Sequence, residues 1–237
     1  MKIIHIIPSL QTGGAERLAL DICIEISKRE RHQVLLLTLN NKNHFESHDF
    51  IKFIDVDVKL SIKSNNKIKV AELQKVVDNF KPDIIHSHLF AAEIISRSIY
   101  YPKAKWFSHF HDNMPQLKNL HLKSFLDKKL ITNFYEKQYL LKSYKKNGGN
   151  EFISISEDTN KYAAKVLPEK YKFHYLKNAI NYSKFNLEKN QRTDTILNLI
   201  NIGSFQAKKN QQFLIDVVKI LKSKKIRFHL SLLGDGD

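Results

Sequence analysis

Short runs of apolar residues alternate with longer amphipathic stretches along most of this chain. Nearly continuous apolar runs indicate strands buried on both faces, and apolar residues at helical spacing indicate helices that cover a sheet. This alternation predicts an α/β fold built on a parallel sheet. We expect strands at residues 3–7, 34–37, 53–54, 83–86, 106–110, 152–155, 171–176, 196–202 and 228–233, and helices at 15–28, 70–80, 91–99 and 211–222.

A polar, charged stretch at 181–195 interrupts this pattern, and we interpret it as a linker. A strand, a helix and a second strand then follow one another. A single strand–helix–strand unit cannot bury both faces of its sheet, and a typical domain needs about 100–150 residues. We therefore expect a domain at 1–180, a linker at 181–195 and the shortened start of a second domain at 196–237.

Composition removes several classes of protein. The 237 residues include one cysteine, Cys23, which excludes a disulfide scaffold and a multi-cysteine metal site. The apolar run at 3–7 stops at Pro8 and is too short for a signal peptide, and no run approaches the ~18 residues of a membrane-spanning helix. We therefore expect a soluble cytoplasmic protein. The net charge of +15 is compatible with binding to a nucleic acid, to an anionic membrane surface or to an anionic substrate. It can also reflect a compositional bias without a function.

Residues that directly follow the strands matter most, because open parallel sheets bind ligands at the carboxyl ends of their strands. Gly13 and Gly14 follow the first strand and open a helix, where glycines admit a ligand and free amides attract an anion. The same two residues also suit a plain tight turn. Without a full G-x-G-x-x-G pattern, a dinucleotide cofactor is not favoured. Lys208 and Lys209 follow Gly203 and can either clamp a phosphate or form a solvated charge pair.

Two His-x-His pairs lie at the ends of expected strands: His86 with His88, and His109 with His111. Residues i and i+2 of a strand point to the same face, so the four imidazoles converge if the two strands are neighbours. That geometry suits Zn²⁺ or a similar ion, with Asp112 as the one nearby carboxylate. We favour the competing interpretation, in which one histidine contacts a substrate hydroxyl or phosphate, the others are structural and no metal is bound.

A basic stretch at 118–146 carries eight lysines among five aromatic residues. It can lie on anionic lipid headgroups, bind a nucleic acid through charge and stacking, or form an ordinary amphipathic helix with a solvated basic face. Gly148 and Gly149 are expected to end its helix, and Ser156 to begin the next one.

Seven short motifs occur in a fixed order along the whole chain. They are GGAER at 13–17, PDIIHSH at 82–88, HFHDN at 109–113, ISISE at 153–157, KNAIN at 177–181, NIGSF at 201–205 with KN at 209–210, and LGDG at 233–236. Together they resemble the family 4 glycosyltransferases, which have the GT-B fold. The chain departs from the family at Ser204, where an arginine is usual, and at Ala179, where a glycine is usual. The family's glutamate-containing donor motif lies beyond the last of these elements, so we expect a chain truncated in its C-terminal domain.

The resemblance implies a Rossmann-like N-terminal domain on the acceptor side and a Rossmann-like C-terminal domain that binds most of a nucleotide sugar. Transfer in the family retains the anomeric configuration and usually needs no metal. The resemblance implies catalytic roles for His111, next to the donor sugar, and for Lys209, which neutralises the departing diphosphate. The other donor-side positions are Gly13, Gly14, Gly203, Ser204, Gly234 and Gly236, and the acceptor-side candidates are Glu16, His88, Asp112 and Asn113.

The resemblance therefore predicts a retaining hexosyltransferase of bacterial surface polysaccharide synthesis, for capsule or exopolysaccharide. The donor would be a UDP- or GDP-sugar, used as a substrate with no further cofactor, and the acceptor a saccharide or a polyprenyl-linked lipid. A lipid-linked acceptor agrees with contact between the basic stretch and the inner face of the cell membrane. Nucleic acid becomes the least favoured partner. Three alternatives stay open: an inactive or incomplete fragment, a nucleotide-sugar epimerase, and a metal-dependent hydrolase that uses the histidine pairs.

Overall fold

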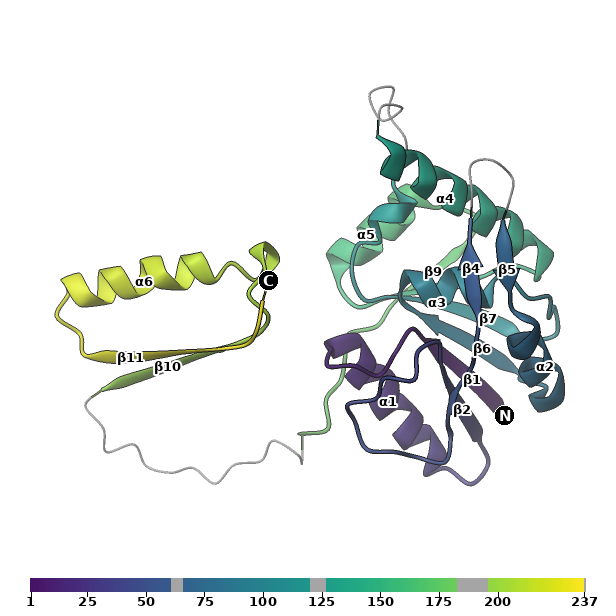
Figure 1. Ribbon diagram of the computed structural model, residues 1–237, viewed down its shortest axis with the longest axis horizontal. Helices are drawn as coiled ribbons and strands as arrows, with labels where there is room; N and C mark the ends of the chain where they lie inside the picture. The colour runs from purple at the N-terminus through teal and green to yellow at the C-terminus, as the bar shows by residue number, and fades with distance from the viewer. Residues whose placement is uncertain (61–65, 120–126, 183–195, 237) are drawn as a thin grey trace. The chain divides into compact units, whose positions relative to one another are not determined.

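A computed structural model describes residues 1–60, 66–119, 127–182 and 196–236 (Figure 1). The chain divides into two units, Met1–Tyr182 and Ser183–Asp237. Most of the expected linker, from residue 183 to residue 195, lies outside the described residues.

The first unit is built on a seven-stranded sheet in the order β3-β2-β1-β6-β7-β8-β9, and all neighbouring strands in it are parallel. The strands are β1 (Lys2–Ile7), β2 (Gln33–Thr38), β3 (Ile51–Phe53), β6 (Ile84–His88), β7 (Lys105–Phe110), β8 (Glu151–Ser154) and β9 (Lys172–Tyr175). From the central pair β1 and β6, the chain adds strands outward on both sides: β2 and β3 next to β1, and β7, β8 and β9 next to β6. The carboxyl ends of these two strands therefore mark the point at which a Rossmann-like sheet binds its ligands. The predicted parallel sheet is confirmed.

Helices pack on both faces of this sheet. On one face, α2 (Ala71–Phe80) and α3 (Leu89–Ser96) share a buried apolar cluster with Ile4 and Trp106. Farther along, α4 (Lys128–Lys146) and α5 (Glu157–Val166) enclose Phe110 and Phe152. On the opposite face, α1 (Gly14–Ser27) shares a buried cluster with Ile7. Burial from two sides explains why the strands are nearly continuous apolar runs.

The helix ends follow the predicted signals, whereas one short hairpin was not predicted. α4 ends before Gly148 and Gly149, whose φ angles of +82° and +107° suit glycine, and a capping box joins Ser156 to Thr159 at the start of α5. The antiparallel pair β4 (Asp57–Lys59) and β5 (Lys67–Lys69) has only three residues in each strand. Such short polar strands carry too little periodicity to be recognised in a sequence.

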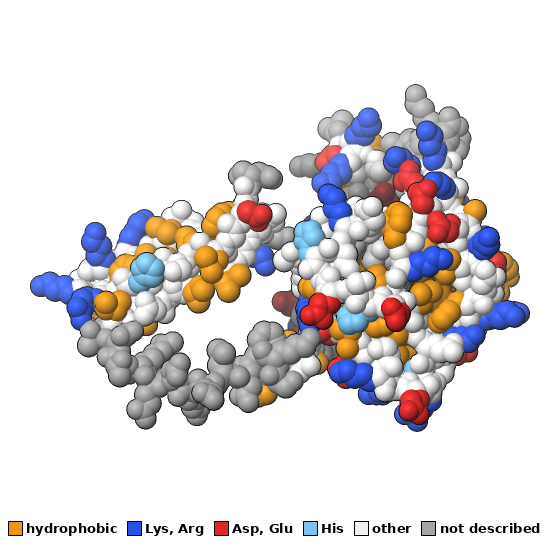
Figure 2. Space-filling model, turned by 60° about the horizontal axis from the view of Figure 1, so that its bottom comes forward, with side chains coloured by type: hydrophobic (Ala, Val, Ile, Leu, Met, Phe, Trp, Pro, Cys, Tyr) orange, Lys and Arg blue, Asp and Glu red, His pale blue; other side chains and the backbone are white. Residues whose placement is uncertain are grey.

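The second unit is a parallel strand–helix–strand unit. It consists of β10 (Leu197–Ile202), a short 3₁₀ turn at Ala207–Lys209, α6 (Gln211–Ser223) and β11 (Phe228–Leu233), with β10 and β11 paired in parallel. Many of its apolar side chains are exposed (Figure 2), including Ile202, at 76% exposure. The predicted strand, helix and strand of this unit are confirmed.

Candidate functional site

Five histidines lie together on the face of the first sheet that α1 covers. In the strand register His5 of β1 lies opposite His86 of β6, and His88 lies opposite His109 of β7. His111 is the first residue after β7 and stacks on His109, with 4.3 Å between ring centroids. The predicted convergence of the two histidine pairs is confirmed. His5 was missed, because it lies within the most apolar run of the chain; the signal that could have found it is that β1 neighbours β6.

His88 connects the two ends of this histidine cluster. Its Nε2 lies 2.9 Å from Nδ1 of His5, and its Nδ1 lies 3.0 Å from Nε2 of His111, so both distances fit hydrogen bonds. His88 itself is fully buried, whereas His111 is only partly buried, at the carboxyl end of β7. The cluster therefore runs from the interior of the sheet to its ligand-binding edge.

The imidazoles of this cluster are uncharged at neutral pH. Burial lowers the pKa of His5 to about 4 and the pKa of His111 to about 4. Burial, together with the nearby His111 and His5, lowers the pKa of His109 to about 3. Burial and the neighbouring imidazoles hold the pKa values of His86 and His88 well below the ordinary range. Nε2 of His86 and both ring nitrogens of His109 have no hydrogen-bond partner within the described part of the chain.

The backbone around His88 is strained where β6 passes into α3. Leu89, the next residue, has a φ of +68° and carries a branched side chain. Such a conformation costs about 1–3 kcal/mol and is found where the surrounding structure fixes it, often at functional sites. The turn places His88 and the start of α3 at the switch point between β1 and β6.

The glycine loop after β1 leads directly into α1. Gly13 stands at the N-cap position with no side-chain hydrogen bond, and Gly14 is the first helical residue. The carboxylate of Glu16 folds back over this turn. A Cβ built on Gly13 would overlap Oε2 of Glu16, so the carboxylate fills the space that a side chain at Gly13 would need. Asp112 and Asn113, the other acceptor-side candidates, are exposed after His111.

Five predicted residues of the second unit come together at the carboxyl ends of β10 and β11. The amide of Gly203 donates to the carbonyl of Leu233 at 2.8 Å. A Cβ on Gly234 would lie 2.0 Å from the carbonyl oxygen of Gly203, so the two turns touch through their backbones. Carbons Cδ and Cε of Lys209 lie beside Gly203. Ser204 follows Gly203 directly, and Gly236 packs against Phe205.

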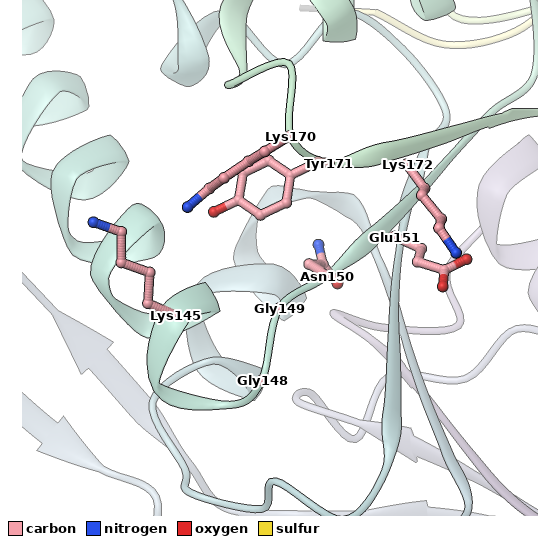
Figure 3. Close-up of a pocket in the computed structure, with 8 residues that line it drawn as sticks. All are labelled: Lys145, Gly148, Gly149, Asn150, Glu151, Lys170, Tyr171 and Lys172. Carbon is pink, nitrogen blue, oxygen red and sulfur yellow. The ribbon is translucent and has the colours of Figure 1, made fainter.

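A separate pocket of about 440 Å³ opens beside the end of α4 (Figure 3). It is lined by Lys145, Gly148, Gly149, Asn150, Glu151, Lys170, Tyr171 and Lys172. Glu151 and Lys172 are the first residues of β8 and β9, so this pocket lies at the amino ends of the strands. It is therefore at the opposite edge of the sheet from the histidine cluster.

The comparisons with known proteins agree with this geometry. A model described as Glycosyltransferase Family 4 matches residues 12–184, which is more than half of the chain. The chain belongs to glycosyltransferase family 4. No curated protein sequence matches it.

Solved structures share the fold of this family 4 chain at low sequence identity. WaaG, a glycosyltransferase involved in lipopolysaccharide biosynthesis, matches with a TM-score of 0.59 and 14% identity over 100% of this chain and 64% of its own. Sucrose-phosphate synthase from Thermosynechococcus elongatus matches with a TM-score of 0.55 and 10% identity, over 99% and 71%. An alpha-glucosyltransferase in complex with UDP and a DNA 13-mer matches with a TM-score of 0.53 and 11% identity, over 99% and 66%. The likeness shows the GT-B fold, and the chain spans about two thirds of these structures.

Proposed function

We propose that this family 4 chain takes part in the retaining transfer of a hexose from a UDP- or GDP-sugar to a saccharide or a polyprenyl-linked acceptor. The observation that carries the proposal is the grouping of five predicted donor-side residues at one end of β10 and β11. Backbone amides in turns closed by glycine can approach a diphosphate, and the ammonium group of Lys209 adds a positive charge beside them. Negative charge develops on the departing diphosphate, so these groups would stabilise the transition state.

In the first unit, His111 is the proposed contact to the donor sugar. Its neutral imidazole can exchange hydrogen bonds with sugar hydroxyls without adding charge, and the contact with His88 holds its ring in place. Glu16, Asp112 and Asn113 are the proposed acceptor-side groups. Carboxylate and amide oxygens accept hydrogen bonds from hydroxyl groups, which suits a saccharide.

Calorimetric titration of the purified chain with UDP-glucose, UDP-N-acetylglucosamine and GDP-mannose tests the donor site. We expect one of these donors to bind, and we expect Lys209→Ala to weaken its binding about tenfold or more because a charge-assisted contact is lost. Lys222→Ala is the matched control, since Lys222 is an exposed lysine on α6. Binding to none of the donors would favour an inactive or incomplete fragment.

Product analysis with and without acceptor then separates the reaction classes. A glycosyltransferase releases the nucleoside diphosphate in proportion to acceptor glycosylated. Conversion of the donor sugar in the absence of any acceptor would indicate an epimerase and contradict the proposed transfer.

The proposal includes a role in surface polysaccharide synthesis at the inner face of the cell membrane. Its support is the row of exposed lysines on α4, which are Lys128, Lys129, Lys142, Lys145 and Lys146. The described part of the chain contains no helix with the length and apolar character needed to span a bilayer. Anionic lipid attracts each such lysine by about 1 kcal/mol, and salt weakens this attraction.

Vesicle co-sedimentation tests the membrane contact. The chain should sediment with phosphatidylglycerol-containing vesicles at low salt and be released at high salt. Changing Lys142, Lys145 and Lys146 together to Glu should abolish sedimentation, whereas the same change at Lys219, Lys222 and Lys224 of the second unit should not. Equal binding to vesicles of phosphatidylcholine alone would contradict an electrostatic membrane contact.

A further inference from the structure

We infer that His88, His109 and His111 form a binding site for a transition-metal ion that prefers imidazole ligands, such as Zn²⁺. One ring nitrogen from each of the three residues lies within 4.8 Å of the others. The inference concerns ion binding by the first unit and does not depend on glycosyl transfer. Because it uses His111, which is also the proposed contact to the donor sugar, an ion and a donor sugar would exclude each other at this residue.

One of the three ligand–ligand distances is close to that of a coordinated ion, and the ring nitrogen of His109 lies within 4.8 Å of the other two ligand atoms. Two ligands that bind Zn²⁺ at about 2.0–2.1 Å in tetrahedral geometry lie about 3.3 Å apart. Nδ1 of His88 and Nε2 of His111 lie 3.0 Å apart, so a small outward movement would bring both to coordinating distance. Both histidines lie at the carboxyl ends of neighbouring strands, His88 as the last residue of β6 and His111 directly after β7, so the movement involves side chains and not the sheet.

The contact with His5 selects the required form of His88. A neutral imidazole carries its proton on one nitrogen only. If Nε2 of His88 donates to Nδ1 of His5, at 2.9 Å, the lone pair on Nδ1 of His88 faces His111 and is available to an ion. A metal-bound histidine usually donates its second ring nitrogen to a fixed partner in this way.

His109 supplies an independent observation. Both of its ring nitrogens are buried and have no hydrogen-bond partner among the described residues. Nearly all buried polar groups in proteins are paired, and an ion or a water is a common explanation where no protein partner exists. A lone pair of His109 would be satisfied by an ion that is shared with His88 and His111.

The partly exposed His111 distinguishes this outer set from an alternative, inner set. His5, His86 and His88 also lie within 4.8 Å of one another, but all three are buried. Since His88 belongs to both sets, one ion cannot use both. The outer set offers an entry path and an open coordination position at the ligand-binding edge of the sheet, where a water or an anionic oxygen could complete the coordination. With three nitrogen ligands and no carboxylate in the set, Zn²⁺, Co²⁺ or Ni²⁺ fits better than Mg²⁺ or Ca²⁺.

Titration of untagged, EDTA-treated full-length chain with Co²⁺ and Zn²⁺ tests the site. We expect one ion per chain, visible Co²⁺ absorption bands of a low-coordinate site, and their loss when Zn²⁺ is added. His109→Gln and His111→Gln should each weaken Zn²⁺ binding about tenfold or more, and His5→Leu should weaken it less by freeing the ring of His88.

His229→Gln is the matched control, because His229 is an exposed histidine on β11 in the second unit. Circular dichroism and thermal unfolding verify that each variant is folded, and the pair of single-site variants keeps the test valid if one of them does not fold. Unchanged Zn²⁺ affinity in folded His109→Gln and His111→Gln variants would overturn the site. Loss of binding in His86→Gln alone would also overturn it, in favour of the inner set.

Discussion

At the scale of single residues, His88 shows how a fully buried side chain can fix the proton position of a partly buried one. Because a neutral imidazole has a single N–H, its contacts with His5 and His111 require that one of its nitrogens donates while the other accepts. A choice of proton position at His5 is therefore transmitted to His111. The tautomer of His111, the residue proposed to touch the donor sugar, would therefore be set by His5, which is buried in the sheet.

Substitution of His5 tests this coupling. His5→Leu removes the partner of His88, and we expect kcat for glycosyl transfer to fall by about tenfold while KM for the donor changes little. His5→Asn should restore part of the rate, because its amide can occupy the position of Nδ1. Steady-state kinetics on both variants provides the measurement. Equal losses in the two variants would show that His5 acts through packing alone.

A buried charged pair makes a second test at this scale. Arg97 and Glu93 of α3 are almost fully buried, with Nε of Arg97 donating to Oε1 of Glu93 at 3.3 Å. Asn150 accepts from Arg97, and the ring of Trp106 lies 4.2 Å from the guanidinium carbon. Arg97→Ala should destabilise the first unit by about 3–5 kcal/mol, because it leaves the buried carboxylate of Glu93 unpaired.

Urea unfolding monitored by Trp106 fluorescence measures this loss. Lys28→Ala is the surface comparison, since its pair with Glu25 is exposed on both sides and should contribute less than about 1 kcal/mol. A loss for Arg97→Ala no larger than that for Lys28→Ala would contradict a structural role for the buried pair.

At the scale of elements, α4 contains a buried structural lysine as well as exposed lysines, and the two kinds cannot be told apart in the sequence. Lys137 is buried, and its ammonium group donates to the carbonyl of Leu117 at 2.8 Å and to the side chain of Asn119. Tyr144, one of the five aromatic residues of the basic stretch, is also buried in the core. The predicted helix is present, but part of its charge and aromatic content is structural.

Lys137→Met is therefore expected to act on stability and not on membrane contact. It removes two hydrogen bonds that a buried ammonium group donates, and should cost about 1–3 kcal/mol. Sedimentation with anionic vesicles should be unchanged, in contrast to the triple variant at Lys142, Lys145 and Lys146. Reduced vesicle binding by a folded Lys137→Met variant would contradict this division of the helix.

The sequence predicted elements where local pattern and tertiary burial agree. The strands of the main sheet are apolar runs, and the meeting of Gly203 with Gly234 follows once β10 and β11 are parallel neighbours. The sequence could not show that Glu93 and Arg97 are buried, because charged residues four apart on a helix usually form a solvated pair. The buried Arg97 donates to Asn150, which lies 53 residues away, and no local pattern indicates that contact.

At the scale of the whole molecule, the two units differ in what holds them together. The first has buried apolar clusters on both faces of its sheet, whereas no residue of α6 in the second is buried. Stability of the first unit can be followed separately, because Trp106 is the only tryptophan of the chain and is buried there. The five neutral histidines also belong to this unit, so their protonation should make its free energy of unfolding depend on pH.

The first unit should lose stability as the pH falls. Unfolded histidine has a pKa of about 6.5, whereas burial lowers the pKa of His5 and His111 to about 4 and of His109 to about 3. Below pH ~6.5 the unfolded chain therefore binds protons that the folded chain does not. In EDTA, the free energy of unfolding should be nearly constant above about pH 7 and should fall toward pH 5, by on the order of 1 kcal/mol per pH unit for each such histidine.

Urea titrations followed by Trp106 fluorescence give this slope, and His109→Gln should make it shallower because one proton-binding difference is removed. A free energy of unfolding that stayed level from about pH 7 to pH 5 would show that the histidines are not held neutral by burial.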